Sequence, residues 1–244
     1  MSDVAEILTN LHTVRDRVAA ACRAVDRDPA HVRLLPVSKT HGIDKILAVH
    51  QAGEPVFGEN RIQEAEAKAA DLADTDIRWA IIGHLQTNKA KNLARFAHEF
   101  HALDSLRVAE ALDRRLQNEG RQLDVMIQVN SSGEPQKFGL APEEVEQFAT
   151  QLTPFSSLNV TGLMTLAVFS PDPAVVGPCF RRMADLQDRL RNNDQAAGSY
   201  DELSMGMSGD FELAIAHGAT CVRLGEAIFG ARLDPNAYWD SRNR

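Results

Sequence analysis

The fold of this chain is constrained most by a regular alternation of short apolar runs with segments of helical periodicity. Apolar runs of strand length occur at residues 32–37, 55–57, 79–82, 99–102, 125–129, 160–164, 202–204 and 221–224. Between them, apolar residues recur three or four positions apart at residues 43–51, 61–72, 105–119, 142–152 and 175–191. Strands that alternate with helices form parallel sheets. Eight such units predict an α/β fold, a single (β/α)8 TIM-type barrel.

A doubly wound open sheet is the structural alternative. It rarely needs eight regular units in a chain of 244 residues, and no G-x-G-x-x-G motif follows the first apolar run. We therefore expect one barrel domain over residues 1–244. Apolar positions at helical spacing mark residues 1–28 as an extra N-terminal helix packed on the barrel, and the residues after Arg232 leave little room for a second domain. Pro36 removes a ladder donor from the first strand, which predicts a β-bulge there.

Composition excludes several classes of function. The 34 acidic and 26 basic residues give a net charge of -8, which disfavours nucleic acids and anionic membranes as partners. The N-terminus lacks the apolar core of a signal peptide, and no run is long enough to span a bilayer. Cys22, Cys179 and Cys221 are far apart, and neither they nor the histidines show metal-ligand spacing. These features predict a cytoplasmic protein without a metal site.

Polar residues directly follow the apolar runs, and in a barrel the loops after the strands form the active face. Lys39 follows the first run. A lysine there has its stem against apolar walls, and desolvation favours the neutral amine, which can capture an aldehyde. A solvated surface lysine is an equally good interpretation from position alone, so the remaining loops must decide.

Two loops after the last two strands are suited to a phosphate. Residues 204–210 contain glycines that let backbone amides approach a ligand, and Ser208 or Asp210 can cap a helix at residues 211–216. Gly225 offers a second amide site after the eighth strand, and barrels often bind phosphate with these two loops together. Plain turns are the alternative for either loop alone. Arg223 lies in an otherwise apolar strand, where it needs an ion-pair partner, an outward position or a ligand.

Seven segments carry a resemblance to a known family. Residues 37–40, 57–60, 82–89, 128–130, 162–165, 203–210 and 222–230 closely resemble the pyridoxal-phosphate homeostasis proteins. The resemblance implies a monomeric barrel similar to the N-terminal domain of bacterial alanine racemase. Such a protein binds pyridoxal 5'-phosphate (PLP) without an established catalytic reaction, and it buffers the cofactor or delivers it to apoenzymes as part of vitamin B6 homeostasis.

The resemblance also implies roles for individual residues. Lys39 would hold PLP as a Schiff base, and Arg223 would face the pyridine nitrogen. The phosphate would be held by Ser208, Gly209 and Gly225. Asn60 and Met164 would line the ring, with His84 and Asn88 at the mouth of the site. Arg61 and Pro36 depart from the family pattern, and neither replaces a predicted ligand.

Several features favour binding over turnover. A permanently charged arginine leaves the ring nitrogen unprotonated and weakens the cofactor as an electron sink. Leu166 follows Thr165, whereas the racemase resemblance calls for a histidine after that threonine, and the second domain of a racemase is missing. Two enzymatic alternatives stay open at this point. One is a PLP-dependent racemase that uses Lys39 and His84 as paired bases, and the other is an aldolase that forms its Schiff base directly with a sugar phosphate.

Overall fold

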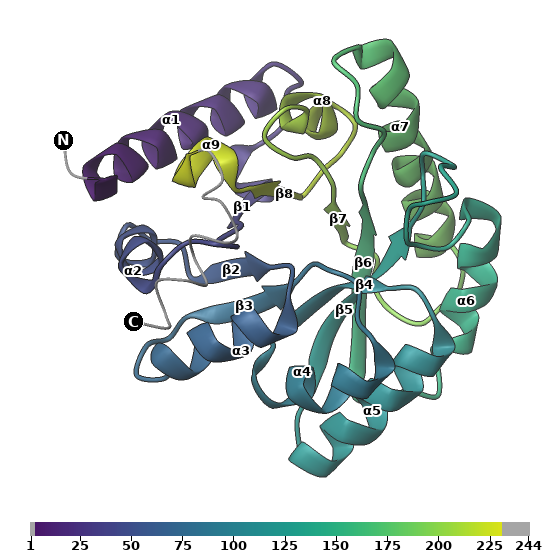
Figure 1. The fold of residues 1–244 in the computed structure, drawn as a ribbon. Helices are drawn as coiled ribbons and strands as arrows, with labels where there is room; N and C mark the ends of the chain where they lie inside the picture. Colours follow the sequence, from purple (N-terminus) through teal and green to yellow (C-terminus); the bar gives the residue numbers. More distant parts are fainter. Residues whose placement is uncertain (1–2, 231–244) are drawn as a thin grey trace.

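Eight parallel strands form a nearly closed barrel with helices around its outside (Figure 1). The structure, a computed structural model, describes residues 3–230. The strands are β1 Arg33–Pro36, β2 Val56–Glu59, β3 Arg78–Ile81, β4 Glu99–Leu103, β5 Leu123–Val129, β6 Leu158–Thr165, β7 Glu202–Ser204 and β8 Cys221–Leu224. Each strand overlaps one of the eight apolar runs, so the predicted TIM-type barrel is confirmed. The residues after Arg232, where we expected no second domain, lie outside the described part of the chain.

Each predicted helical segment contains a helix, and one further helix, α4, follows β3 where the periodicity predicted none. The longer helices are α1 Asp3–Arg23, α2 Ile43–Gln51, α3 Ile62–Asp71, α4 Ala90–Phe96, α5 Leu106–Glu119, α6 Val145–Gln151 and α7 Pro173–Arg191. Two short helices, α8 Phe211–Ala216 and α9 Glu226–Phe229, follow β7 and β8. Three 3-10 turns complete the set: η1 Pro29–His31, η2 Thr87–Lys89 and η3 Pro142–Glu144. Every strand therefore ends in a loop on the same side of the barrel.

The barrel has a seam between β1 and β2. In the described residues, β1 and β2 meet through the bridge between Val37 and Gly58, which lies beyond the end of β1. The other neighbouring strands pair within the sheet itself, although β7 and β8 share the single pair Ser204 and Cys221. The predicted bulge at Pro36 is wrong, because β1 pairs with β8 in continuous register from Arg33 to Pro36. The amide of Val37 donates to Leu224 of β8. Successive amides in a strand point to opposite sides, so the nitrogen of Pro36 faces the seam, where no ladder needs its proton.

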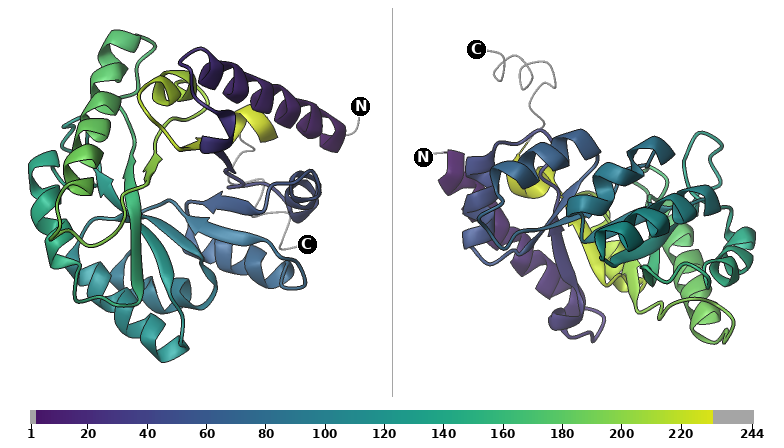
Figure 2. Two further views of the ribbon diagram at one scale, coloured as in Figure 1. Left: turned by 180° about the vertical axis from the view of Figure 1, so that it is seen from behind. Right: turned by 90° about the horizontal axis from the view of Figure 1, so that it is seen from below.

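Helix α1 lies outside the barrel beside the seam. It packs against α2 on one side and against α8 and α9 on the other, and it runs alongside α9 in both Figure 1 and Figure 2. Asn10 donates to the carbonyl of Ile228 at 3.3 Å, and the guanidinium of Arg17 lies 4.7 Å from the centre of the Phe211 ring. The predicted packing of the N-terminal helix on the barrel is thus present, and it joins the first and last units of the barrel.

The interior of the fold is apolar and continuous between strands and helices. Phe57, Phe100 and Phe180 are fully buried members of one core cluster that draws on most elements of the barrel. Cys22, Cys179 and Cys221 are buried free thiols. Among residues 3–230, no helix combines the length and apolarity needed to cross a membrane, and no group of three or more metal-ligating side chains comes together.

Candidate functional site

A pocket of about 360 Å3 opens at the carboxyl ends of the strands. This volume lies in the range of small-molecule sites, and the location is where barrels carry their active faces. The pocket brings together residues from the loops after most of the strands. Six of the residues predicted to bind the cofactor line it: Lys39, Asn60, Ser208, Gly209, Arg223 and Gly225.

The remaining predicted residues have different positions. His84 lines the pocket and stacks on Phe138, with ring centres 4.1 Å apart and planes at 12°. Met164 is fully buried in β6 and is not one of the pocket-lining side chains. Asn88 is exposed in η2, and Arg61 is exposed at the start of α3, both away from the lining. A contact between Met164 and the ring therefore stays a prediction.

Sequence reasoning missed an apolar rim around the pocket mouth. The rim consists of Phe138, Leu166, Phe169 and Met207, and Phe169 is 98% exposed. Exposed large apolar side chains that gather around a pocket mark a surface for ligands or partners. These residues lie in irregular loops, where neither spacing nor composition distinguishes them from turn residues, so the sequence offered no signal for the rim.

The turn that carries Lys39 is fixed on both sides of that residue. The hydroxyl of Ser38 donates to Glu59 Oε1 at 2.7 Å, and the amide of Thr40 donates to Glu64 Oε1 at 2.6 Å. Thr40 also has a φ of 65°, a left-handed conformation that is costly for a β-branched residue. Such a conformation persists only where surrounding contacts hold it. Here the hydrogen bonds to the buried carboxylates of Glu59 and Glu64 anchor the backbone on either side of Lys39.

A buried ion cluster of Lys68, Glu59 and Glu64 provides this anchor. Lys68 is 0% exposed, and its ammonium donates to Glu59 Oε1 at 2.7 Å, to Glu64 Oε1 at 2.8 Å and to the carbonyl of Ser38 at 2.7 Å. All three ammonium protons therefore have partners, as a buried charge requires. Glu59 Oε2 is buried without a hydrogen-bond partner, and burial raises the pKa of Glu59 to about 7 despite Lys68.

The loops after β7 and β8 are tied to each other. The amide of Ala227 in α9 donates to Ser208 Oγ at 3.3 Å. The prediction that Ser208 or Asp210 caps α8 is wrong: Asp210 is the first residue before the helix but its side chain makes no cap bond, and its carboxylate accepts from the amide of Met207 at 2.6 Å. The Asp210 carboxylate thus bonds within its own loop, and Ser208 is the residue that connects the loop after β7 to the loop after β8.

Three backbone donors at this end of the pocket have no acceptor in the part of the chain that the structure describes. Among the hydrogen bonds of residues 3–230, none uses the amides of Ser208, Gly209 or Gly225. All three residues line the pocket. Backbone amides in a glycine-containing loop that lack internal partners are suited to an anionic group. The predicted phosphate site therefore has donors available.

Arg223 forms the floor on the strand side of the pocket. It is 3% exposed, and it donates to Ser204 Oγ at 2.9 Å and to the carbonyl of Thr165 at 2.8 Å. Burial lowers the pKa of Arg223, but a guanidinium stays charged throughout the physiological range. No carboxylate in the described residues forms a salt bridge with it. Its charge and its remaining donors are therefore available to a ligand.

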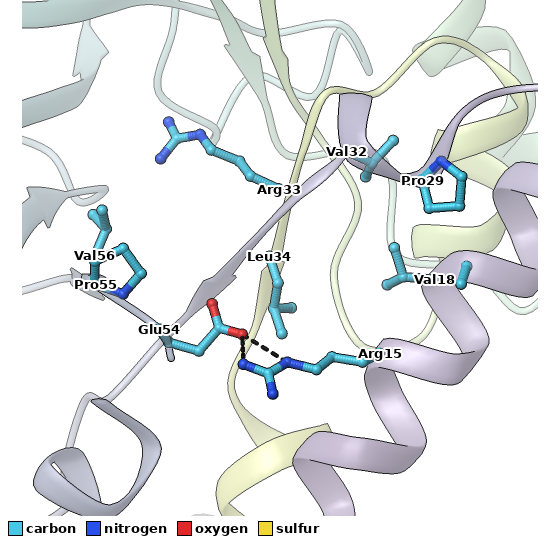
Figure 3. A pocket seen from close by; sticks show the side chains of 10 residues that line it. Arg15, Val18, Pro29, Val32, Arg33, Leu34, Glu54, Pro55 and Val56 are labelled. Atoms are coloured by element: carbon cyan, nitrogen blue, oxygen red, sulfur yellow. Dashed lines mark hydrogen bonds and ion pairs between the residues drawn. The ribbon is translucent and has the colours of Figure 1, made fainter. Parts of the chain in front are cut away.

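A second pocket of about 320 Å3 lies at the opposite end of the barrel (Figure 3). Val32 and Arg33 at the start of β1 line it, and the ion pair between Arg15 and Glu54 spans it. It contains none of the predicted site residues, and its arginines face carboxylates. The chemistry that the sequence predicts is therefore confined to the carboxyl-end pocket.

Comparisons with known proteins give the chain a family. Residues 9–233 match the family model described as alanine racemase, N-terminal domain. A pyridoxal phosphate homeostasis protein of Pseudomonas aeruginosa is 40% identical over 232 residues, which cover 95% of this chain and 97% of that protein. The Synechococcus elongatus protein PipY, solved with PLP bound, is 34% identical with a TM-score of 0.74, and the match covers 87% of this chain and 100% of PipY.

More distant structures support the fold alone. An alanine racemase of Clostridium difficile superimposes with a TM-score of 0.72 at 13% identity, over 95% of this chain and 61% of the racemase. The racemase thus has a large part that this chain does not match. The close relatives, in contrast, match along almost their whole length, as the residues gathered at the pocket had indicated. The chain belongs to the alanine racemase N-terminal domain family and, within it, to the pyridoxal phosphate homeostasis proteins.

Proposed function

We propose that this protein binds PLP in the carboxyl-end pocket and holds it covalently through the amine of Lys39. The observation that carries the proposal is that Lys39 follows β1, the strand next to β8, and shares one pocket with the joined loops after β7 and β8 and their unused backbone donors. PLP carries its aldehyde and its phosphate-bearing methylene on adjacent ring carbons, so it needs these two features side by side in a single site. The PLP-bound structure of PipY supports this assignment.

The residues of the pocket fit the group. Lys39 would bind the aldehyde, the amides of Ser208, Gly209 and Gly225 would bind the phosphate, and Arg223 would face the ring nitrogen. Asn60 lies on the wall beside Lys39 and would contact the ring edge, and Met164 would support the ring from within β6. When bound in enzymes, PLP supplies an electron sink for chemistry at the carbon next to an amino group. The charge of Arg223 opposes that role, because it disfavours a proton on the ring nitrogen.

We further propose that the protein holds PLP without turning over a substrate. Leu166 follows Thr165 where a racemase would carry a histidine, and the names of the close relatives refer to homeostasis. A PLP-dependent racemase that uses Lys39 and His84 is the alternative, and the shared fold of alanine racemase is its support. Incubation of the PLP-loaded protein with a panel of L-amino acids, followed by chiral analysis, separates the two. Racemisation that Lys39→Ala abolishes would establish the enzyme.

Covalent capture is the direct test of the binding proposal. We expect the purified protein to develop a near-visible absorption band with PLP, and borohydride reduction to leave a pyridoxyl adduct on Lys39 by peptide mass spectrometry. Lys39→Ala should lose both signals. Lys45→Ala is the matched control, because Lys45 is a neighbouring lysine that pairs with Asp3 and does not line the pocket. An adduct on another lysine, or a sugar-phosphate adduct in place of the pyridoxyl group, would contradict the proposal.

The proposed partners are apoenzymes that receive PLP from this protein. We expect the protein itself to act as a cytoplasmic monomer. The exposed apolar rim of Phe138, Leu166, Phe169 and Met207 supports a contact surface at the pocket mouth. A recipient that docks there would take the cofactor without its release into solvent. Light scattering of the purified protein would test the monomer, and a cofactor-transfer assay would test the surface.

A further inference from the structure

A chain of polar side chains crosses the barrel interior and ends at Arg223. It runs from Arg33 of β1 through Glu99 and His101 of β4 and Ser204 of β7 to Arg223 of β8. His101 and Ser204 are fully buried, and the exposed fraction of Glu99 is 7%. Arg33 lines the pocket of Figure 3, whereas Arg223 lines the carboxyl-end pocket. The chain therefore connects the two ends of the barrel.

Each neighbouring pair in the chain lies within hydrogen-bond distance. The guanidinium of Arg33 donates to both oxygens of Glu99, at 3.1 and 2.7 Å. His101 Nε2 lies 2.8 Å from Glu99 Oε2, and His101 Nδ1 lies 3.1 Å from Ser204 Oγ. Arg223 completes the chain with its 2.9 Å bond to the same hydroxyl.

The donors and acceptors in this chain have one consistent order. A guanidinium can only donate, so Ser204 Oγ accepts from Arg223, and a carboxylate can only accept, so His101 Nε2 donates to Glu99. In the neutral imidazole, Nδ1 then accepts the proton of Ser204. Nδ1 must then be unprotonated, and Nε2 carries the proton that it donates to the Glu99 carboxylate. Arg33 supplies the charge that balances Glu99. The order therefore requires a neutral His101 with its proton on Nε2.

The electrostatics of the chain agree with this order. Burial lowers the pKa of His101, although Glu99 opposes the shift, so the imidazole stays neutral at physiological pH. Burial alone would raise the pKa of Glu99, but the hydrogen bond from His101 and the charge and hydrogen bonds of Arg33 hold it well below its usual range. The chain thus keeps this proton order at neutral pH.

We infer that His101 is a positioning residue for the cofactor site: it turns the Ser204 hydroxyl so that its oxygen accepts from Arg223, and so fixes the guanidinium toward the ring nitrogen of PLP. Without an acceptor at His101 Nδ1, the proton of the Ser204 hydroxyl turns away from His101 and interferes with the hydrogen bond from Arg223. The buried cation then loses one of its two fixed bonds. This inference rests on the proposed function, because it assigns a role in PLP binding to residues that do not contact PLP.

Two amide substitutions distinguish the roles of the two ring nitrogens of His101. His101→Asn places an oxygen near the Nδ1 position and keeps the acceptor for Ser204. His101→Gln places an amide near the Nε2 position, keeps a donor to Glu99 and loses the acceptor. We expect His101→Gln to weaken PLP binding about five- to tenfold, the loss typical of one buried hydrogen bond, and His101→Asn to bind within about twofold of wild type. Equal losses in both variants would overturn the inference.

A PLP analogue without the ring nitrogen separates a specific effect on Arg223 from general destabilisation of the protein. Only the specific effect depends on that nitrogen. We expect His101→Gln and Ser204→Ala to lose affinity for PLP, but not for 1-deazapyridoxal 5'-phosphate, which has carbon in place of that nitrogen. Ser204→Ala keeps the test valid if the histidine variant does not fold. Gln187→Met, which removes a buried bond to the carbonyl of Tyr200 away from the pocket, controls for stability. Equal losses for both ligands, or no loss for either, would contradict the role.

Failure of this inference is distinguishable from failure of the proposed function. The wild-type protein is first tested for the pyridoxyl adduct on Lys39 and for its affinity for PLP. Absence of the adduct overturns the proposed function itself, and the variants are then irrelevant. If wild type forms the adduct but His101→Gln and Ser204→Ala bind both ligands as wild type does, PLP binding stands and the positioning role of His101 is wrong.

Discussion

At the residue scale, Glu59 is the group whose protonation most directly affects the site. Its carboxyl is buried between Lys68, Glu64 and Ser38, and its second oxygen has no partner. A buried carboxyl with an unpartnered oxygen favours the protonated form. The residue that anchors the Lys39 turn therefore changes its charge near neutral pH, because the pKa of Glu59 is about 7.

This raised pKa predicts how stability depends on pH. The folded state binds the Glu59 proton more tightly than the unfolded state, whose pKa is near 4.5. The resulting stabilisation is complete below that value and is lost as pH rises through 7. We expect the free energy of unfolding of wild type to fall by up to about 3 kcal/mol relative to Glu59→Gln between about pH 5 and pH 8.

Denaturant unfolding at a series of pH values checks this prediction. The two proteins should be most alike at the acidic end of the range, where Glu59 is protonated and resembles the neutral amide, and wild type should become the less stable protein as pH rises through 7. Curves that run parallel, or a wild type that gains stability relative to Glu59→Gln as pH rises, would show that Glu59 is ionised throughout.

At the element scale, the loop between β7 and α8 depends on Gly206. Its φ is 94°, and a Cβ there would lie 2.7 Å from the Cβ of Ala214 and 2.9 Å from the Cα of Phe211. Only glycine satisfies both the left-handed conformation and this close approach to α8. The loop that presents Ser208 and Gly209 to the pocket is thus held against the helix by a residue that does not itself line the pocket.

Two glycine substitutions in this loop should therefore differ in cost. We expect Gly206→Ala to destabilise the protein by about 1–3 kcal/mol, because it adds both backbone strain and a clash. Gly209→Ala should cost clearly less stability, because a Cβ there meets no atom within 4 Å. Urea unfolding of both variants measures the difference. A Gly206→Ala protein as stable as Gly209→Ala would show that the loop relaxes away from α8.

The strands were predictable because their apolar runs are local signals, and the same holds for the loops that carry Lys39 and Ser208. The Lys68 cluster was not predictable. Glu64 and Lys68 are four residues apart on a helix, a spacing that is typical of an exposed ion pair. Only the packing of α3 against the Lys39 turn buries them. Likewise, Pro36 is tolerated because its nitrogen faces β2 rather than β8, the strand with which β1 is paired. The sequence of β1 does not indicate which of the two strands will pair with it.

The polar pair in β4 does have a local signal in the sequence. Glu99 and His101 lie two positions apart within an apolar run, and residues at that spacing point to the same face of a strand. Two polar residues on the inner face of a barrel strand need buried partners. Their partners, however, come from β1, β7 and β8, so the complete polar chain appears only when the barrel is assembled.

At the scale of the whole molecule, the apolar rim makes a prediction about cofactor transfer. Phe169 is the most exposed of the rim residues. If a recipient apoenzyme docks on the rim, transfer of PLP should be faster than its release into solution, and Phe169→Ser should slow transfer toward the rate of release. Stopped-flow measurement with a recipient apoenzyme, and separately with a small-molecule PLP trap, gives both rates. Equal rates for the wild-type protein would indicate delivery through free PLP alone.

The seam between β1 and β2 has a further consequence for the way this protein holds its ligand. Within the sheet, opening the barrel here breaks the bridge at Val37 and Gly58, but it also breaks the hydrogen bonds that join Ser38 and Thr40 to Glu59, Glu64 and Lys68. Lys39 stands two residues beyond that bridge. The turn that carries Lys39 is thus held across the seam by buried side-chain charges rather than by strand pairing, so the grip on the ligand depends on the charge state of those side chains.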